Sequence, residues 1–401
     1  MQLTCTEEVH EYGGPGRFLL SRSEDALPEL IEEYGGSVQL IYLDPPFGTG
    51  DTFHIRLSGG QKAEYAPVYA DDLGRDAYLA WMRTILTGCH ALLSDEGSLF
   101  LHIDYRMSAH LRLLLDEIFG ASNFVNEIIW CYKSGGRSTN HFSRKHDTIL
   151  FYRKSKRGYF NIEATGKPRG PEKRNHMKRA VAPDGRVSFS IRSGGKTYTY
   201  YEDTPIYPTD VWSDIEHLQQ KDSERIGYAT QKPEALLDRI LLSASRPGDL
   251  VMDLFSGSGT TAAAAARLGR RFVAVDASPF ALSALRVRLL ANADHLSLFR
   301  TDHALRLSYP PASDTAEIDA VRLENGRIEL RQARFDETHP LAYLALGYAD
   351  EGCFYPRFAT TKPKLPLLLN CGGDNGTVLH IADTLGRQAF IELCPEETEH
   401  V

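Results

Sequence analysis

The sequence predicts an α/β fold with a doubly wound, mainly parallel Rossmann-like sheet, an inserted basic region and a small β-rich C-terminal domain. Short apolar runs alternate with helical spacing before residue 153 and again after residue 226, a pattern typical of parallel sheets with crossover helices. Basic residues dominate the interval between them, and hairpin patterns follow residue 307. We expect two halves of one domain at 1–130 and 226–300, the insertion at 131–225, and the C-terminal domain at 301–401.

The first half of the main domain is predicted from apolar spacing. Strands are short runs of β-branched and aromatic residues, and helices repeat apolar residues every three or four positions. These patterns predict strands at 17–20, 38–43 and 98–103 and helices at 23–33, 76–93 and 111–118. Ser23 is expected to cap the first helix and Asp104 the third. Residues 48–69, with four glycines, are expected to form a loop over a pocket.

The remaining elements follow from the same patterns. They are strands at 126–132, 148–152, 250–255 and 271–275 and helices at 235–243 and 260–268. Near the C-terminus, apolar runs at 321–323 and 328–330 flank Asn325 and Gly326, a pair typical of tight hairpin turns. A second hairpin is expected from 377–381 and 388–393. The sequence does not indicate a role for this C-terminal part.

Charge is distributed unevenly along the chain. The 401 residues carry a net charge of −8, but residues 131–200 hold 17 Lys and Arg against 4 Asp and Glu. A local charge of +13, interleaved with aromatic residues, is typical of a surface that binds nucleic-acid phosphates and bases. The alternative is a solvated, charged insertion.

The composition argues against several other classes of protein. No stretch approaches the roughly 18 apolar residues of a membrane span, and the first residues do not resemble a secretory signal. The 6 cysteines lack C-x-x-C spacing, and His141, His146 and Asp147 lack the spacing of metal ligands. A solvated or phosphate-binding loop explains those three residues better. We therefore expect a cytoplasmic protein without a disulfide framework or a metal site.

Asp44, Pro45, Pro46 and Phe47 directly follow the strand at 38–43. The two prolines fix φ and remove two N–H donors, so the turn presents acceptors and an aromatic face. Acceptors of this kind suit the amino group of a nucleobase, because taking its hydrogens can pull the nitrogen toward a tetrahedral, nucleophilic geometry. Phe47 could stack on the extruded base. An ordinary proline-rich turn with a solvated Asp is the alternative.

A glycine turn lies between the predicted strand at 250–255 and helix at 260–268. Gly257 and Gly259 would let a nucleotide-like ligand approach the helix N-terminus, and Asp276 ends the next strand where an acid meets ribose hydroxyls. The spacing Gly257-x-Gly259-x-x-Ala262 also fits the dinucleotide fingerprint. An NAD-dependent oxidoreductase is therefore one hypothesis for this turn.

The order of the two motifs, DPPF ahead of FSGSGTT with Gln231, Lys232 and Pro233 shortly before the latter, resembles the β-class amino DNA methyltransferases of the adenine-N6 type. That family includes restriction-modification enzymes and stand-alone bacterial or phage enzymes. The resemblance covers about residues 18–290, with further matches at 78–82, 97–104, 119–130 and 145–152. In the family a Gly-Asp pair usually follows the first strand, where this chain has Ser21 and Arg22, so that cofactor contact is open.

The resemblance implies methylation of adenine N6 in a specific DNA sequence after base flipping, with S-adenosyl-L-methionine as cofactor. No metal is implied, because transfer from a sulfonium requires alignment rather than a Lewis acid. The implied catalytic residues are Asp44, Pro45, Pro46 and Phe47. The implied cofactor-binding residues are Gln231, Lys232, Pro233, Asp253, Phe255, Ser256, Gly257, Gly259, Thr260, Thr261 and Asp276.

Double-stranded DNA is the expected partner, and a homodimer and a restriction or other defence-system partner are further expectations. The target-recognition region of the family lies between residues 152 and 231 here. The predicted DNA-binding residues are Lys133, Arg137, Arg144, Lys145, Arg153, Lys154, Lys156, Arg157, Lys173, Arg174, Lys178 and Arg179. Cytosine-N4 methylation is the nearest alternative, although that subclass more often has Ser where Asp44 stands. An inactive DNA-binding module is a third reading.

Overall fold

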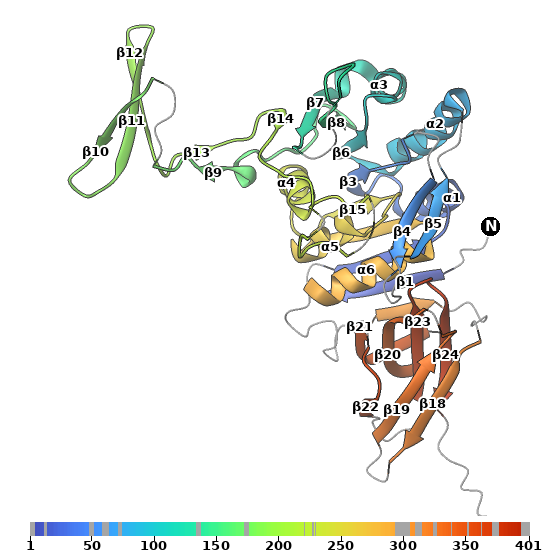
Figure 1. Cartoon of the computed structure of the whole chain (residues 1–401). Helices are drawn as coiled ribbons and strands as arrows, with labels where there is room; N and C mark the ends of the chain where they lie inside the picture. Colours follow the sequence, from blue (N-terminus) through green and yellow to red (C-terminus); the bar gives the residue numbers. More distant parts are fainter. Residues whose placement is uncertain are drawn as a thin grey trace, which may run out of the picture.

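The computed structural model describes most of the chain (Figure 1). The described residues are 5–11, 14–47, 52–57, 64–70, 74–133, 138–171, 176–219, 221–226, 228, 230–292, 305–308, 315–323, 327–337, 339–350, 353–361, 363–370 and 377–393. No helix in these ranges combines the length and hydropathy that crossing a membrane requires.

One large sheet runs through the molecule. Its strands in spatial order are β14 (Val211–Trp212), β7 (Phe124–Cys131), β8 (His146–Arg153), β6 (Leu93–Ile103), β3 (Val38–Leu43), β15 (Leu250–Asp253), β16 (Arg271–Asp276), β2 (Gly14–Leu20), β1 (Cys5–Glu11), β17 (Leu305–Ser308), β21 (Cys353–Thr361), β20 (Leu341–Asp350), β23 (Thr377–Asp383) and β24 (Gln388–Leu393). From β6 to β2 the neighbours are parallel, and from β2 to β24 they are antiparallel. The predicted fold class is confirmed.

Helices cover both faces of the parallel part. They are α1 (Ser23–Tyr34), α2 (Arg75–Leu92), α3 (Ser108–Leu115), α4 (Glu234–Ala244), α5 (Thr260–Arg267) and α6 (Pro279–Asn292). Leu40 and Tyr42 of β3 point into the core formed with α4, α5 and α6, whereas Ile41 and Leu43 point into the core formed with α1, α2 and α3. Both faces of the strand are buried, which explains its nearly continuous run of apolar residues.

Two local predictions in the first half were wrong. The residue before α1 is Arg22, and the Ser23 hydroxyl donates to the Leu254 carbonyl at 2.5 Å instead of capping the helix. Residues 48–69 were expected to form a loop, but they contain β4 (Thr52–Leu57), which pairs antiparallel with β5 (Glu64–Ala70). The β-branched and aromatic residues of these strands outweighed the glycines that suggested a loop.

The basic insertion forms an arm. β9 (Lys167–Pro168) and β13 (Pro205–Ile206) pair at its base, and β10 (Lys178–Val181), β11 (Val187–Ser193) and β12 (Lys196–Tyr201) form a three-stranded antiparallel sheet at its tip. Figure 1 shows this arm projecting sideways from the parallel sheet, on the side of α4 and β14.

The C-terminal part lies beyond β1, at the end of the sheet opposite β14, and is seen below β1 and α6 in Figure 1. The predicted pairing of β23 with β24 is confirmed, as is that of β18 (Glu317–Arg322) with β19 (Arg327–Arg334), although Asn325 and Gly326 lie outside the described residues. A third strand, β22 (Leu367–Asn370), pairs with β19 in a separate small sheet. Because β17 pairs with both β1 and β21, the C-terminal strands continue the main sheet.

Candidate active site

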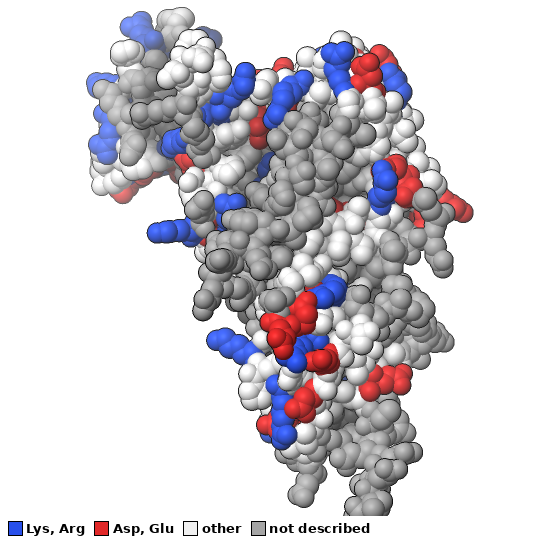
Figure 2. All heavy atoms as spheres, turned by 45° about the vertical axis from the view of Figure 1, so that its right-hand side comes forward, with Lys and Arg blue, Asp and Glu red and all other residues white. Residues whose placement is uncertain are grey.

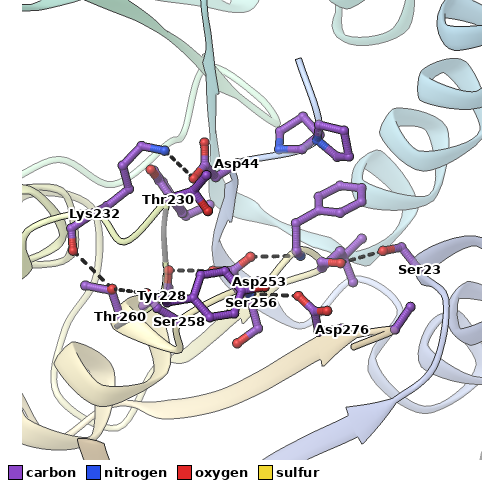
Figure 3. A pocket seen from close by; sticks show the side chains of 18 of the residues that line it. Ser23, Asp44, Tyr228, Thr230, Lys232, Asp253, Ser256, Ser258, Thr260 and Asp276 are labelled. Carbon is purple, nitrogen blue, oxygen red and sulfur yellow. Dashed lines mark hydrogen bonds and ion pairs between the residues drawn. The ribbon is translucent and has the colours of Figure 1, made fainter. Parts of the chain in front are cut away.

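A pocket opens where three neighbouring parallel strands end. β3 leads into Asp44, β15 ends at Asp253 and β16 ends at Asp276, and all three acids line a cavity of about 220 Å³. The carboxyl ends of parallel strands are the usual binding edge of a doubly wound sheet. The sequence-predicted motifs, some 200 residues apart, therefore meet at one site, as Figure 3 shows.

The turn at 44–47 is held from two sides. The Tyr78 hydroxyl of α2 donates to the Pro46 carbonyl at 2.6 Å. On the other side the Lys232 ammonium lies 2.5 Å from Asp44 Oδ2 and 5.5 Å from the centre of the Phe47 ring (Figure 3). Among the described residues no donor reaches the buried Asp44 Oδ1. One carboxylate oxygen is thus paired, and the other is available as an acceptor.

The glycine turn is shaped by backbone geometry. Gly259 precedes α5 with φ +75°, and a Cβ there would lie 2.9 Å from Leu285 Cδ1. Only glycine adopts this conformation at such close approach without strain. The Asp276 carboxylate accepts the N–H of Gly257 and the N–H of Ser278, each at 2.8 Å, so the acid itself holds the turn.

Buried acids dominate the electrostatics of the pocket. Asp253 accepts the Thr261 hydroxyl at 2.5 Å and the Phe255 N–H at 3.0 Å, yet burial raises its pKa to about 7. Burial likewise raises the pKa of Asp276 to about 6. Such groups ionise readily once a cation enters, so the pocket favours a positively charged ligand. In the described part of the chain, no group of three His, Cys, Asp or Glu is arranged to hold a metal ion.

The pocket brings together most of the predicted residues. Asp44, Pro45, Pro46 and Phe47 line it, and so do Lys232, Asp253, Phe255, Ser256, Gly257, Thr260, Thr261 and Asp276. Gln231, Pro233 and Gly259 do not. The Gln231 side chain instead donates to the Glu224 carbonyl and accepts from the Ile226 N–H, which supports the chain leading into α4.

The predicted DNA-binding residues separate into three groups. In the first group, Lys133 follows β7, and Arg144 and Lys145 precede β8. All three lie at the end of the strands where Asp44 lies. Lys178 and Arg179 are exposed on the arm. Arg153 pairs with Ser98 at the opposite edge of the sheet, and residues 154–157 follow it there. Arg137, Lys173 and Arg174 lie outside the described residues.

The basic run 153–157 already contacts its own protein. The Lys154 ammonium donates to the His90 carbonyl, the Lys156 ammonium to the Ser122 carbonyl, and the Arg157 guanidinium pairs with Asp95. DNA contacts were predicted for these side chains from their charge alone, because the sequence does not show at which end of the strands they lie. The placement argues against that assignment.

Several pocket residues were not predicted. Tyr42 lies two positions before Asp44 on one face of β3, so strand alternation could have identified it. Arg22 and Glu24 also line the pocket, and they form an ion pair at 2.5 Å. Asp104 accepts the Arg106 N–H in the turn before α3 and does not line the pocket. Asp147, expected in a solvated or phosphate-binding loop, is instead the second residue of β8 and lies beside His102.

The comparison with known proteins identifies the family. The family model described as "DNA methylase" matches residues 38–286. The chain belongs to this DNA methylase family. It is 31% identical over 320 residues to the type II methyltransferase M.EcaI of Enterobacter cloacae, covering 68% of this chain and 69% of that protein. It is 28% identical over 255 residues to the DNA adenine methyltransferase YhdJ of Escherichia coli K12, covering 63% and 76%.

Among solved structures, this DNA methylase is similar to the cytosine-N4-specific PvuII DNA methyltransferase. The TM-score is 0.45 at 15% identity, with 70% of this chain and 88% of the other covered. The family match supersedes the oxidoreductase hypothesis, which depended on the glycine spacing alone.

Proposed function

We propose that this DNA methylase transfers a methyl group from S-adenosyl-L-methionine to the N6 amino group of adenine in a specific DNA sequence, after the base is flipped out of the duplex. The observation that carries the proposal is the Asp44 carboxylate, which lines the acid-rich pocket with one buried oxygen unpaired among the described residues. An amino group entering there would find an acceptor already in place.

The pocket chemistry fits the cofactor. When bound, S-adenosyl-L-methionine supplies a methyl group on a positively charged sulfonium. Asp253 and Asp276 would meet its positive charge and its ribose hydroxyls, and the glycine turn gives the backbone close access. The Lys232 ammonium, held at Asp44, would be a cationic partner for a ligand carboxylate in this pocket.

Asp44 and Phe47 would act on the flipped base. The Asp44 carboxylate and the Pro45 carbonyl would accept the two amino hydrogens, which draws the nitrogen toward a nucleophilic geometry. Phe47, whose ring is fixed against Lys232 and His102, would stack on the base. The nitrogen–carbon bond forms as the sulfur–carbon bond breaks, and the amino nitrogen then loses a proton to solvent.

Adenine is favoured over cytosine by the presence of Asp44 in the tetrapeptide and by the relative named as a DNA adenine methyltransferase. Cytosine-N4 methylation is the second candidate, because its amino group would find the same acceptors. A homodimer and a restriction partner stay predictions, as do the domain boundaries given above.

The arm presents two different faces to a DNA duplex. Strand register places Val187, Phe189, Tyr198 and Tyr200 on one face, where Val187 and Phe189 are buried and Arg169 stacks on Tyr200 at 4.6 Å. The opposite face carries hydroxyls flanked by cations, and no acid of these strands lies on it. Its residues are Lys178, Ala180, Ser188, Ser190, Arg192, Thr197, Thr199 and Tyr201.

We therefore assign DNA contacts to this hydroxyl face of the arm, together with Lys133, Arg144 and Lys145 at the pocket edge. Hydroxyls, Lys and Arg are the usual partners of phosphate oxygens, and a β-ribbon fits the major groove. In Figure 2 Lys and Arg predominate over Asp and Glu on the arm at the upper left, whereas the two kinds alternate over the C-terminal part below.

The test is a single-turnover reaction with labelled S-adenosyl-L-methionine and genomic DNA. The product nucleosides are separated and identified by mass, and the modified positions are mapped by sequencing. N6-methyladenine at a recurring sequence is expected. N4-methylcytosine as the product would replace adenine by cytosine in the proposal, and no transfer despite cofactor binding would leave an inactive DNA-binding module.

A further inference from the structure

Three polar side chains form a buried chain behind the turn at 44–47. The Tyr42 hydroxyl of β3 lies 2.8 Å from His102 Nδ1 of β6, and His102 Nε2 lies 3.2 Å from Asp147 Oδ2 of β8. The His102 side chain is fully buried, and 14% of the Asp147 side chain is exposed. Polar groups are costly to bury unless they are paired, so their presence beside the catalytic turn requires an explanation. The methyl transfer proposed above makes no use of them.

The hydrogen bonds have a defined direction. Burial by itself raises the pKa of Asp147, but the hydrogen bond with His102, together with Lys232 and Tyr132, lowers it overall. The Asp147 carboxylate can therefore only accept, and His102 Nε2 must carry the proton that it donates. In the neutral ring Nδ1 is then an acceptor, and the Tyr42 hydroxyl donates to it.

The chain touches the catalytic turn at two points. Tyr42 lines the pocket two residues before Asp44. The His102 ring packs against Phe47, with centroids 6.2 Å apart and planes 27° apart, and the Trp130 ring is edge-on to the His102 ring with centroids 5.7 Å apart. The Trp130 indole is in turn fixed by a 2.9 Å bond to the Ile215 carbonyl. Rotation of the His102 ring would change the support of Phe47 and release the Tyr42 hydroxyl.

We propose that His102 is a positioning residue for methyl transfer: held in one tautomer by Asp147, it fixes the Tyr42 hydroxyl and the Phe47 ring in the places from which they meet cofactor and base. The inference rests on the proposed function, because it assigns Phe47 to the flipped base. It adds Tyr42, His102 and Asp147, which lie on three strands, to the residues that serve methyl transfer. His102 and Asp147 act on the reaction only through Tyr42 and Phe47.

The informative variants are Asp147→Asn and Tyr42→Phe. The Tyr132 hydroxyl donates to Asp147 Oδ1 at 3.1 Å, so an amide at 147 would keep its oxygen there and turn its NH₂ toward His102. That reverses the tautomer, because Nε2 must now accept. Tyr42→Phe removes the hydroxyl at the other end of the chain and leaves the ring. Tyr132→Phe is the matched control, since it deletes a bond to Asp147 but leaves the chain from Tyr42 to Asp147 intact.

In single-turnover assays on a DNA duplex whose methylated position has been mapped with the unaltered protein, Asp147→Asn and Tyr42→Phe should each lower the transfer rate by about tenfold to a hundredfold. DNA affinity should stay within about twofold, and cofactor affinity should fall by less than the transfer rate does. The double variant should be no slower than the worse single variant, because both break one unit. Tyr132→Phe should change the rate by less than about threefold.

Thermal unfolding of each variant shows whether it is folded, and Tyr42→Phe carries the test if Asp147→Asn is not. Fluorescence of 2-aminopurine at the mapped position reports whether the extruded base is stacked, a readout that a purely structural role would leave unchanged. Additive losses, unchanged rates, or rates that fall only in step with cofactor affinity would overturn the proposal. A lack of methylation by the unaltered protein would instead contradict the proposed function itself.

Discussion

The pocket and the arm differ in how far their polar side chains are already buried and paired within the protein. In the pocket, Asp253 is buried and Asp276 is half-buried, both acids accept backbone N–H groups, and Asp44 is paired with Lys232. On the arm, every residue of β10 is exposed, and all of β12 is exposed except Tyr200, which is half-buried. The pocket is thus preformed and acidic, whereas the arm presents cations and hydroxyls that a partner would have to satisfy.

This difference predicts different consequences of mutation. Changes in a preformed, buried site should appear in reaction rate or cofactor affinity, and they should depend little on salt. Changes on an exposed basic face should appear in DNA affinity and in its dependence on salt, because each lost phosphate contact lowers the slope by about 0.9. The following tests go from the largest expected effect to the smallest.

Asp44→Ala should have the largest effect. The acceptor that strengthens as the amino nitrogen becomes tetrahedral is lost, so methyl transfer should fall by roughly a hundredfold or more while cofactor and DNA affinity stay nearly intact. Asp44→Asn keeps the size but turns donors toward the amino group, and it should also be severely impaired. Near-normal single-turnover rates in the Ala variant would remove Asp44 from the mechanism.

Asp276→Ala should weaken cofactor binding by about tenfold or more. It removes the expected ribose contact and also leaves the N–H groups of Gly257 and Ser278 without their acceptor. Asp276→Asn retains one acceptor and should lose less. Calorimetry with S-adenosyl-L-methionine measures both variants. Equal affinity in all three proteins would show that the acid supports neither turn nor ligand.

Cofactor affinity should rise with pH. Burial holds the pKa of Asp253 at about 7 and that of Asp276 at about 6, above the ordinary value of 3.8, so the free protein keeps extra protons and loses stability as pH rises through this window. A cationic ligand favours the ionised acids. Between pH 5 and 7.5 its affinity should therefore increase, by up to about tenfold per pH unit while one acid titrates.

Thermal unfolding with and without the cofactor checks this pH dependence. The melting temperature of the free protein should fall over the window, and the gain on adding S-adenosyl-L-methionine should grow. S-adenosylhomocysteine, which lacks the sulfonium charge, is the matched control and should show a weaker trend. A gain that shrinks with rising pH would be inconsistent with protonated acids in the pocket.

Lys178→Ala combined with Arg192→Ala should weaken DNA binding and lower its salt slope by up to about two units. The control is Arg179→Ala with Lys196→Ala, which removes the same charge from the same small sheet but on the opposite face. Fluorescence anisotropy with a duplex at several salt concentrations measures both. Equal losses from the two pairs would mean that total charge, rather than the hydroxyl face, governs binding.

The smallest effect is expected from Lys156→Ala with Arg157→Ala. Both side chains contact the protein at the amino edge of the sheet, and exposed ion pairs such as that of Arg157 with Asp95 contribute below about 1 kcal/mol. The salt slope of DNA binding should not change. A salt slope lower by one unit or more would show that these side chains contact DNA, as the charge pattern alone suggested.

The sequence by itself determined the elements and motifs that depend on neighbouring residues. Apolar spacing predicted β3, β15, β16 and the helices between them within a few residues of their bounds. Turn chemistry placed Asp44 and the glycines at strand ends, and the rule that parallel strands share a binding edge brought them together. These inferences succeeded because strand, turn and helix preferences act over a few positions.

Only the tertiary structure decided which side chains face one another across strands. The pairing of Lys232 with Asp44, the chain from Tyr42 through His102 to Asp147, and the location of residues 153–157 at the far edge all depend on strand order and register. The same is true of the arm, where register brings Lys178 of β10 opposite Ser190 of β11, on the face that carries the hydroxyls. Charge and residue type are local properties, but what a side chain contacts is set by packing between segments far apart in the chain.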